Sequence, residues 1–91
     1  METRKAYIEK LSARLKEWDA RIDLLKAHAE EARADAKIAV HRQIAELKDL
    51  RQEAAQRLAE LHEAGDEKWQ DIHDRAEKLA DDVKKTLKKA A

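Results

Sequence analysis

The stretch that decides the fold runs from Ile8 to Ala36 and reads IEKLSARLKEWDARIDLLKAHAEEARADA. Apolar residues recur in it at alternating spacings of three and four positions, over more than four heptads. Such an a/d repeat is typical of an amphipathic helix that buries a narrow apolar stripe against another helix. The stretch therefore predicts an all-α fold, built as a coiled coil or a helical bundle.

We call this apolar repeat the seam. It continues toward the C-terminus with shifts at Val40 and at Gly65, among others, where steps of four follow each other. Such a stutter locally unwinds a left-handed supercoil. Arg51 occupies a seam position, where it either sets the register or lays its stem along the seam with its charge outside. The residues that we expect to form a self-association seam are Ile8, Leu11, Leu15, Trp18, Ile22, Leu25, Ala29, Ala32, Ala36, Val40, Ile44, Leu47, Ala54, Leu58, Leu61, Trp69, Ile72, Ala76, Leu79, Val83 and Leu87.

The helix boundaries are predicted from breaker residues. Between Thr3 and Ala64 no residue argues for a helix end, whereas Gly65 and Asp66 form the one breaker pair of the sequence. Glycine suits the left-handed position just past a helix end, and aspartate suits the N-cap of the next helix. We therefore expect a long helix over about 3–64 and a shorter one over about 66–90, in a single domain 1–91 with its break at 65–66. A kinked but continuous helix is the alternative at that point.

The seam can also be folded about Ala36, which places Trp18 opposite Ala54 and brings small alanines together at the centre. Two arrangements have this pairing. One is an antiparallel dimer of long helices, and the other is a monomeric three-helix bundle whose first turn lies near Asp35. The lack of a turn residue there favours the dimer.

Composition excludes several classes of protein. The 91 residues include no cysteine and no proline, with 44% charged and 3% aromatic side chains, which is typical of a long helix or coiled coil. A chain this short builds a marginal core, and without cysteines oligomerisation is the expected support. The 20 basic and 20 acidic residues cancel, so we expect no nucleic-acid partner. Without a long apolar run or a signal-peptide core, membrane binding is disfavoured and a cytoplasmic protein is expected.

The sequence contains no arrangement typical of a reactive site. His28, His41, His62 and His73 are never three or four residues apart, which is the spacing that helical metal sites usually need. We expect these histidines to face solvent, with no metal ligand, no cofactor and no catalytic residue. The chain is therefore predicted not to be an enzyme.

The C-terminal stretch Asp74–Ala91, DRAEKLADDVKKTLKKAA, resembles the repeats of late-embryogenesis-abundant stress proteins and the helices of exchangeable apolipoproteins. This resemblance implies a stress-protective or lipid-surface amphipathic protein that becomes helical when dried or bound to lipid. We keep that function as the alternative to a structural or protein-interaction role.

A second resemblance covers the whole chain. It is carried by Leu15–Ile38, by Gln43–Leu61 (QIAELKDLRQEAAQRLAEL) and by Glu63–Trp69 (EAGDEKW), and by the Trp18-Asp19 pair in particular. The chain resembles small bacterial coiled-coil proteins of unassigned function. The resemblance implies a bacterial, soluble, helical protein and no activity. With the seam, it leads us to expect a non-enzymatic protein that associates with itself, or with another coiled-coil protein.

Overall fold

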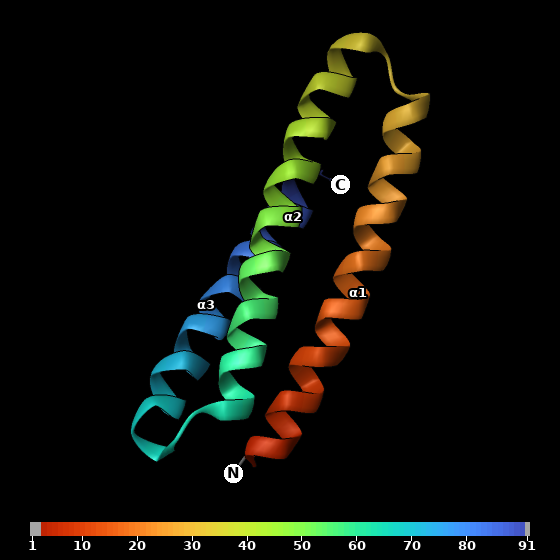
Figure 1. The fold of residues 1–91 in the computed structure, drawn as a ribbon. Coiled ribbons are helices and arrows are strands. Elements are labelled where there is room, and N and C mark those ends of the chain that lie inside the picture. The colour runs from red at the N-terminus through yellow and green to blue at the C-terminus, as the bar shows by residue number, and fades with distance from the viewer. Residues whose placement is uncertain (1–2, 91) are drawn as a thin grey trace.

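The computed structural model describes residues 3–90, which form three helices and no strand. These are α1 (Arg4–Glu31), α2 (Ala34–Glu63) and α3 (Asp66–Ala90). Figure 1 shows α1 and α2 as an antiparallel hairpin, with α3 folding back along α2. The result is a rod with extents of 50 × 20 × 17 Å. The expected all-α fold is confirmed.

The predicted continuous helix over 3–64 is wrong. The first helix ends at Glu31, and Ala32 and Arg33 are extended, with ψ values of 159° and 157°. The observed turn lies close to the position near Asp35 expected for the three-helix alternative. The physical reason is tertiary, because folding the chain back at this point buries the apolar stripe of each helix against the other.

Both ends of the α2–α3 connection follow the predicted break, but the role expected of the glycine is wrong. Gly65 does not have a positive φ, nor does any other described residue. Its carbonyl accepts a hydrogen bond from the Trp69 N–H at 3.0 Å, so Gly65 rather than Asp66 stands at the N-cap position of α3. Asp66 and Glu67 lie in the first turn, where negative charge is favoured by the helix dipole.

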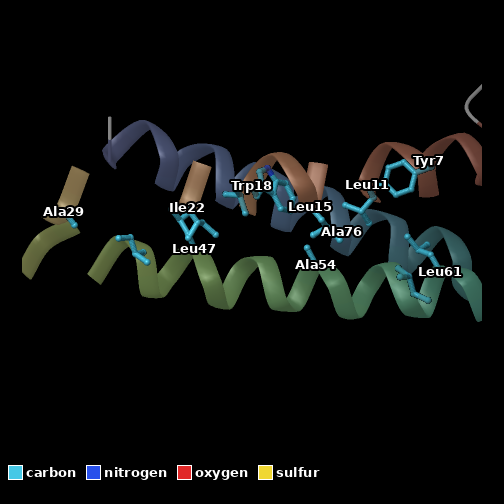
Figure 2. Packing of buried hydrophobic residues seen from close by; sticks show 13 residues of the cluster. Tyr7, Leu11, Leu15, Trp18, Ile22, Ala29, Leu47, Ala54, Leu61 and Ala76 are labelled. Carbon is cyan, nitrogen blue, oxygen red and sulfur yellow. The ribbon is translucent and has the colours of Figure 1, made fainter. Parts of the chain in front are cut away.

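One apolar layer runs along the whole rod. Figure 2 shows it as a series of pairings, with Ile22 beside Leu47 and, further along, Trp18 and Leu15 near Ala54. The fully buried or nearly buried apolar residues of this core are Tyr7, Leu11, Leu15, Trp18, Ile22, Ala29, Ile44, Leu47, Ala54, Leu61, Ile72, Ala76 and Val83.

The register of the hairpin is marked by an ion pair between Asp19 and Arg51. In the sequence, Asp35 stands midway between these two paired residues. The hairpin is thus symmetric about Asp35, which is next to Ala36, the centre expected from the sequence.

Candidate functional site

The seam is buried within the single chain. Twenty of its 21 predicted residues are buried or half-buried between the three helices, and Ala36 alone is exposed. Because α1, α2 and α3 cover each other's stripes, the seam is not an open surface in this conformation. Any association that uses it has to exchange helices between chains.

Trp18 is among the buried seam residues, with 8% of its surface exposed. It lines a groove between α1 and α3 with a volume of about 560 Å³. The apolar part of this groove also includes Ala80 and Leu87 from α3. The other residues that line the groove are charged. Figure 2 shows Trp18 near Ala54, the small residue that was expected opposite it.

An aromatic cluster joins the start of α1 to the start of α3. The ring centroid of the fully buried Tyr7 lies 5.8 Å from that of Trp69 and 4.2 Å from that of His73. Trp69 and His73 stack on each other at 5.5 Å, and the guanidinium of Arg4 lies 5.4 Å above the Trp69 ring. Arg4 also pairs with Asp66. Ring packing, a cation–π contact and an ion pair thus hold α1 against α3 at this end.

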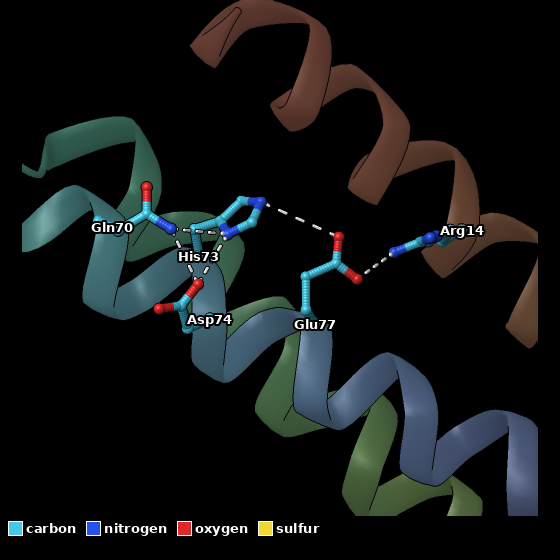
Figure 3. Close-up of polar contacts among 5 residues, drawn as sticks. All are labelled: Arg14, Gln70, His73, Asp74 and Glu77. Carbon is cyan, nitrogen blue, oxygen red and sulfur yellow. Dashed lines mark hydrogen bonds and ion pairs between the residues drawn. The ribbon is translucent and has the colours of Figure 1, made fainter. Parts of the chain in front are cut away.

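A polar chain continues from this cluster along the same two helices (Figure 3). His73 Nδ1 lies 3.2 Å from Asp74 Oδ1, and Gln70 donates to the same oxygen at 2.9 Å. Hydrogen bonds from His73 and Gln70 hold the pKa of Asp74 below its usual range. His73 Nε2 lies 4.0 Å from Glu77 Oε1, and Arg14 on α1 donates to Glu77 Oε2 at 3.2 Å.

The expectation that all four histidines face solvent is wrong for His73. His28, His41 and His62 are exposed, but His73 is half-buried and packs against two aromatic rings that also contact each other. The neighbouring rings come from α1 and from the preceding turn of α3, so the position depends on how those helices pack. Within residues 3–90 no three His, Cys, Asp or Glu side chains gather in a way that could hold a metal ion.

Polar side chains also join the helices on either side of α2. Arg51 Nε lies 2.9 Å from Asp19 Oδ1, and its Nη2 donates to Asp19 Oδ2 at 3.0 Å. Of the two roles considered for Arg51, the stem along the seam with the charge outside fits this half-buried, paired geometry. On the other side, the buried Thr86 donates its hydroxyl to Glu46 on α2 at 3.4 Å.

Two lysines from α1 and α2 face each other beside this ion pair. The ammonium of Lys26 lowers the pKa of Lys48 through a hydrogen bond and through like-charge repulsion, while Asp23 acts in the opposite direction. Both lysines line a shallow polar depression with Asp19 and Arg51. The edge of the α1–α2 interface is therefore mixed in charge.

Sequence reasoning missed two buried residues, Tyr7 and Thr86, and the half-buried His73. Tyr7 lies four positions before Leu11 on the same side of the helix, so a wider apolar stripe of the kind found in bundles would have included it. Thr86 also has a signal, because it follows Val83 by three positions and so continues the alternation of three and four from Ala76 and Leu79, which the step to Leu87 breaks. Its burial depends on the acceptor that Glu46 supplies from another helix.

The features that carry interaction chemistry are therefore the buried seam and the ion pairs along its edges. None of the described helices has the length and apolar character needed to cross a membrane. Comparison with protein-family models, with curated proteins and with solved structures found no match for this chain. The resemblance to small bacterial coiled-coil proteins stays a prediction, and function is inferred from the geometry of the chain alone.

Proposed function

We propose that the chain is a non-enzymatic helical interaction protein that associates with a second copy of itself through the seam. The single observation that carries this proposal is the symmetric register of the α1–α2 hairpin. The Asp19–Arg51 pair centres the hairpin on Asp35. The α2 helix of a second chain has the same surface as the α2 helix on which α1 packs within one chain. It therefore offers α1 of the first chain the same apolar layer and the same charges at its edges.

Self-association also fits the size of the chain. A rod only 20 × 17 Å across exposes much of its surface, and short chains without disulfides often gain stability by oligomerisation. We place such a protein in the cytoplasm of a bacterium, with itself as the main partner and another coiled-coil protein as a second kind of partner.

Light scattering coupled to size exclusion, run over a wide range of protein concentration, tests this function. We expect a concentration-dependent rise from the mass of one chain to that of two. The matched control is the double variant Leu24→Gln/Ile38→Gln, which removes the two large apolar side chains that are exposed within the described residues, at 54% and 65%. Association through the seam survives this change, whereas association through loose surface patches is lost. One-chain mass at every concentration would refute the proposal.

The alternative is a stress-protective or lipid-surface protein. It is favoured by α3, whose buried Ile72, Ala76 and Val83 share one face while acidic and basic residues cover the rest, with lysines gathered toward its C-terminal end. Circular dichroism in dilute buffer separates the two functions. A self-associating bundle is helical without lipid and melts cooperatively, while the alternative gains its helicity only on anionic vesicles or on drying.

A further inference from the structure

The connection between α1 and α2 is extended, and it differs from a helix in its ψ angles. Ala32 has φ −77° and ψ 159°, and Arg33 has φ −67° and ψ 157°. The φ angle is therefore close to its usual helical value at both residues, and only ψ lies in the extended region. Rotation about ψ at two residues is enough to join α1 and α2 into one helix.

The side chains at this connection favour such a joined helix. Alanine and arginine rank among the strongest helix formers, and neither glycine nor proline occurs from Glu31 to Ala36. Arg33 provides no side-chain cap for α2. Glu30 and Glu31 end α1 at the negative pole of its dipole, and Arg33 precedes the positive pole of α2, so these three charges oppose the usual preference, whereas Asp35 in the first turn of α2 follows it. A continuous helix removes both poles.

The other connection is built differently. It contains Gly65, it is followed by two acidic residues in the first turn of α3, and Asp66 is tied to α1 by Arg4. The α2–α3 connection thus has the residues of a permanent turn, while the α1–α2 connection has the residues of a helix.

The third helix leaves the first connection free. Figure 1 shows that α3 ends well before the tip of the α1–α2 hairpin. At that tip Ala34 and Ala36 are exposed, and Ile38 has 65% of its surface exposed. The hinge can therefore open without first displacing α3 from α2.

We infer that Ala32–Arg33 is a hinge through which two copies of the chain exchange α1. This inference rests on the self-association proposed above and specifies its route. In the exchanged dimer, residues 4–63 of each chain form one helix, and α1 of each copy packs on α2 of the other. The Asp19–Arg51 pair and the Tyr7–Trp69 contact then join two chains, while the Thr86–Glu46 bond stays within one.

The balance between the two forms depends on concentration. In the hairpin, about four backbone N–H groups at the start of α2 have no partner within the helix. When the hinge opens, these N–H groups can donate to backbone carbonyls of α1. Pairing two chains costs translational and rotational freedom. Because every contact of α1 must break before it re-forms on the partner, exchange is slow compared with the collision of two chains.

A proline at position 34 tests the hinge. Ala34 is the first residue of α2, where proline fits, and the preceding Arg33 has the extended backbone that proline favours. The same proline in the middle of a continuous helix removes a hydrogen bond and clashes with the preceding turn. Ala34→Pro should therefore keep its helicity by circular dichroism and lose the two-chain mass seen for the unmodified chain. The matched control Arg33→Ala keeps helix propensity and should retain that mass.

Crosslinking gives a second readout that does not depend on the proline variant. The chain lacks cysteine, so a chain carrying Asp19→Cys and a chain carrying Arg51→Cys each have one thiol. After the two are unfolded and refolded together, a short bismaleimide should join them into covalent heterodimers. A mixture in which Leu24→Cys replaces Asp19→Cys should give none, because Leu24 is exposed on another side of α1.

The outcomes separate the hinge from the proposed function. A two-chain mass that persists in Ala34→Pro, without crosslinking between positions 19 and 51, overturns the hinge and leaves self-association standing. A one-chain mass for the unmodified chain at every concentration overturns both. Loss of the dimer in Ala34→Pro together with crosslinking of the mixed chains establishes the exchange.

Discussion

Replacement of Trp18 by alanine is the most direct test of the packing between the three helices. Trp18 is 8% exposed and belongs to the continuous apolar layer of the rod. Truncation of a buried tryptophan to alanine costs about 3–5 kcal/mol, from lost transfer free energy and from the cavity that remains. We expect a value near the lower end, about 3 kcal/mol, because the groove beside Trp18 lets water enter the space.

This loss is large for a chain of 91 residues. Domains of this size lose about 4–8 °C of melting temperature for each kcal/mol, so Trp18→Ala should melt at least about 12 °C lower. Urea unfolding followed by far-ultraviolet circular dichroism gives the free energy of unfolding directly. All variants are compared at one protein concentration, because association shifts apparent stability.

The matched control is Leu24→Ala on the same helix. Leu24 has 54% of its surface exposed, so its truncation should change the free energy of unfolding by only about 0.5 kcal/mol. If Trp18→Ala proves too unstable to purify folded, Trp18→Leu keeps most of the apolar volume and should lie between the two. Equal, small losses for Trp18→Ala and Leu24→Ala would show that the indole is not part of a packed core.

Three other predictions follow from the charged groups. The pKa of Asp74 is lowered by its bonds to His73 and Gln70, so its contribution to stability is complete above the unfolded value of about 3.9 and is lost as pH falls through the folded value. The stability difference between the unmodified chain and Asp74→Asn, measured by urea unfolding, should therefore shrink below about pH 4, and a difference that does not change with pH would contradict this. A double-mutant cycle with Asp19→Ala and Arg51→Ala should give a coupling free energy of about 0.5–1 kcal/mol in unfolding. This coupling should weaken in high salt, because the pair is partly exposed. Zero coupling at low salt would argue against the observed register of α1 on α2. Solubility should be lowest near the isoelectric point of about 6.9 and rise on mild acidification, as the net positive charge of the chain grows, and a minimum far from neutrality would count against this.

The start of α1 and the connection between α2 and α3 could be predicted from local chemistry. Thr3 accepts a hydrogen bond from the Ala6 N–H, as an N-cap threonine does, and the Gly65–Asp66 pair precedes α3. Both are decided by residues within a few positions of the helix end. The same holds for the burial of the seam, because an apolar period of three and four places its residues on one side of a helix in any packed arrangement.

The turn at Ala32–Arg33 could not be read in this way. Locally, these residues favour a helix, and the positive charge of Arg33 is unfavourable just before the start of α2. Only the burial of α1 on α2 along the length of the hairpin compensates for the broken helix, and no window of sequence contains that contact. Tyr7, His73 and Arg51 likewise acquire their partners from helices distant in the chain.

The sequence by itself determined that this protein is helical and which side of each helix is apolar, because both depend on propensity and period within a few turns. The tertiary structure decided which helix covers which stripe. The same apolar contacts can be made within one chain or between two chains. Which of the two forms depends on the ψ angles of Ala32 and Arg33, which local chemistry allows to be helical or extended.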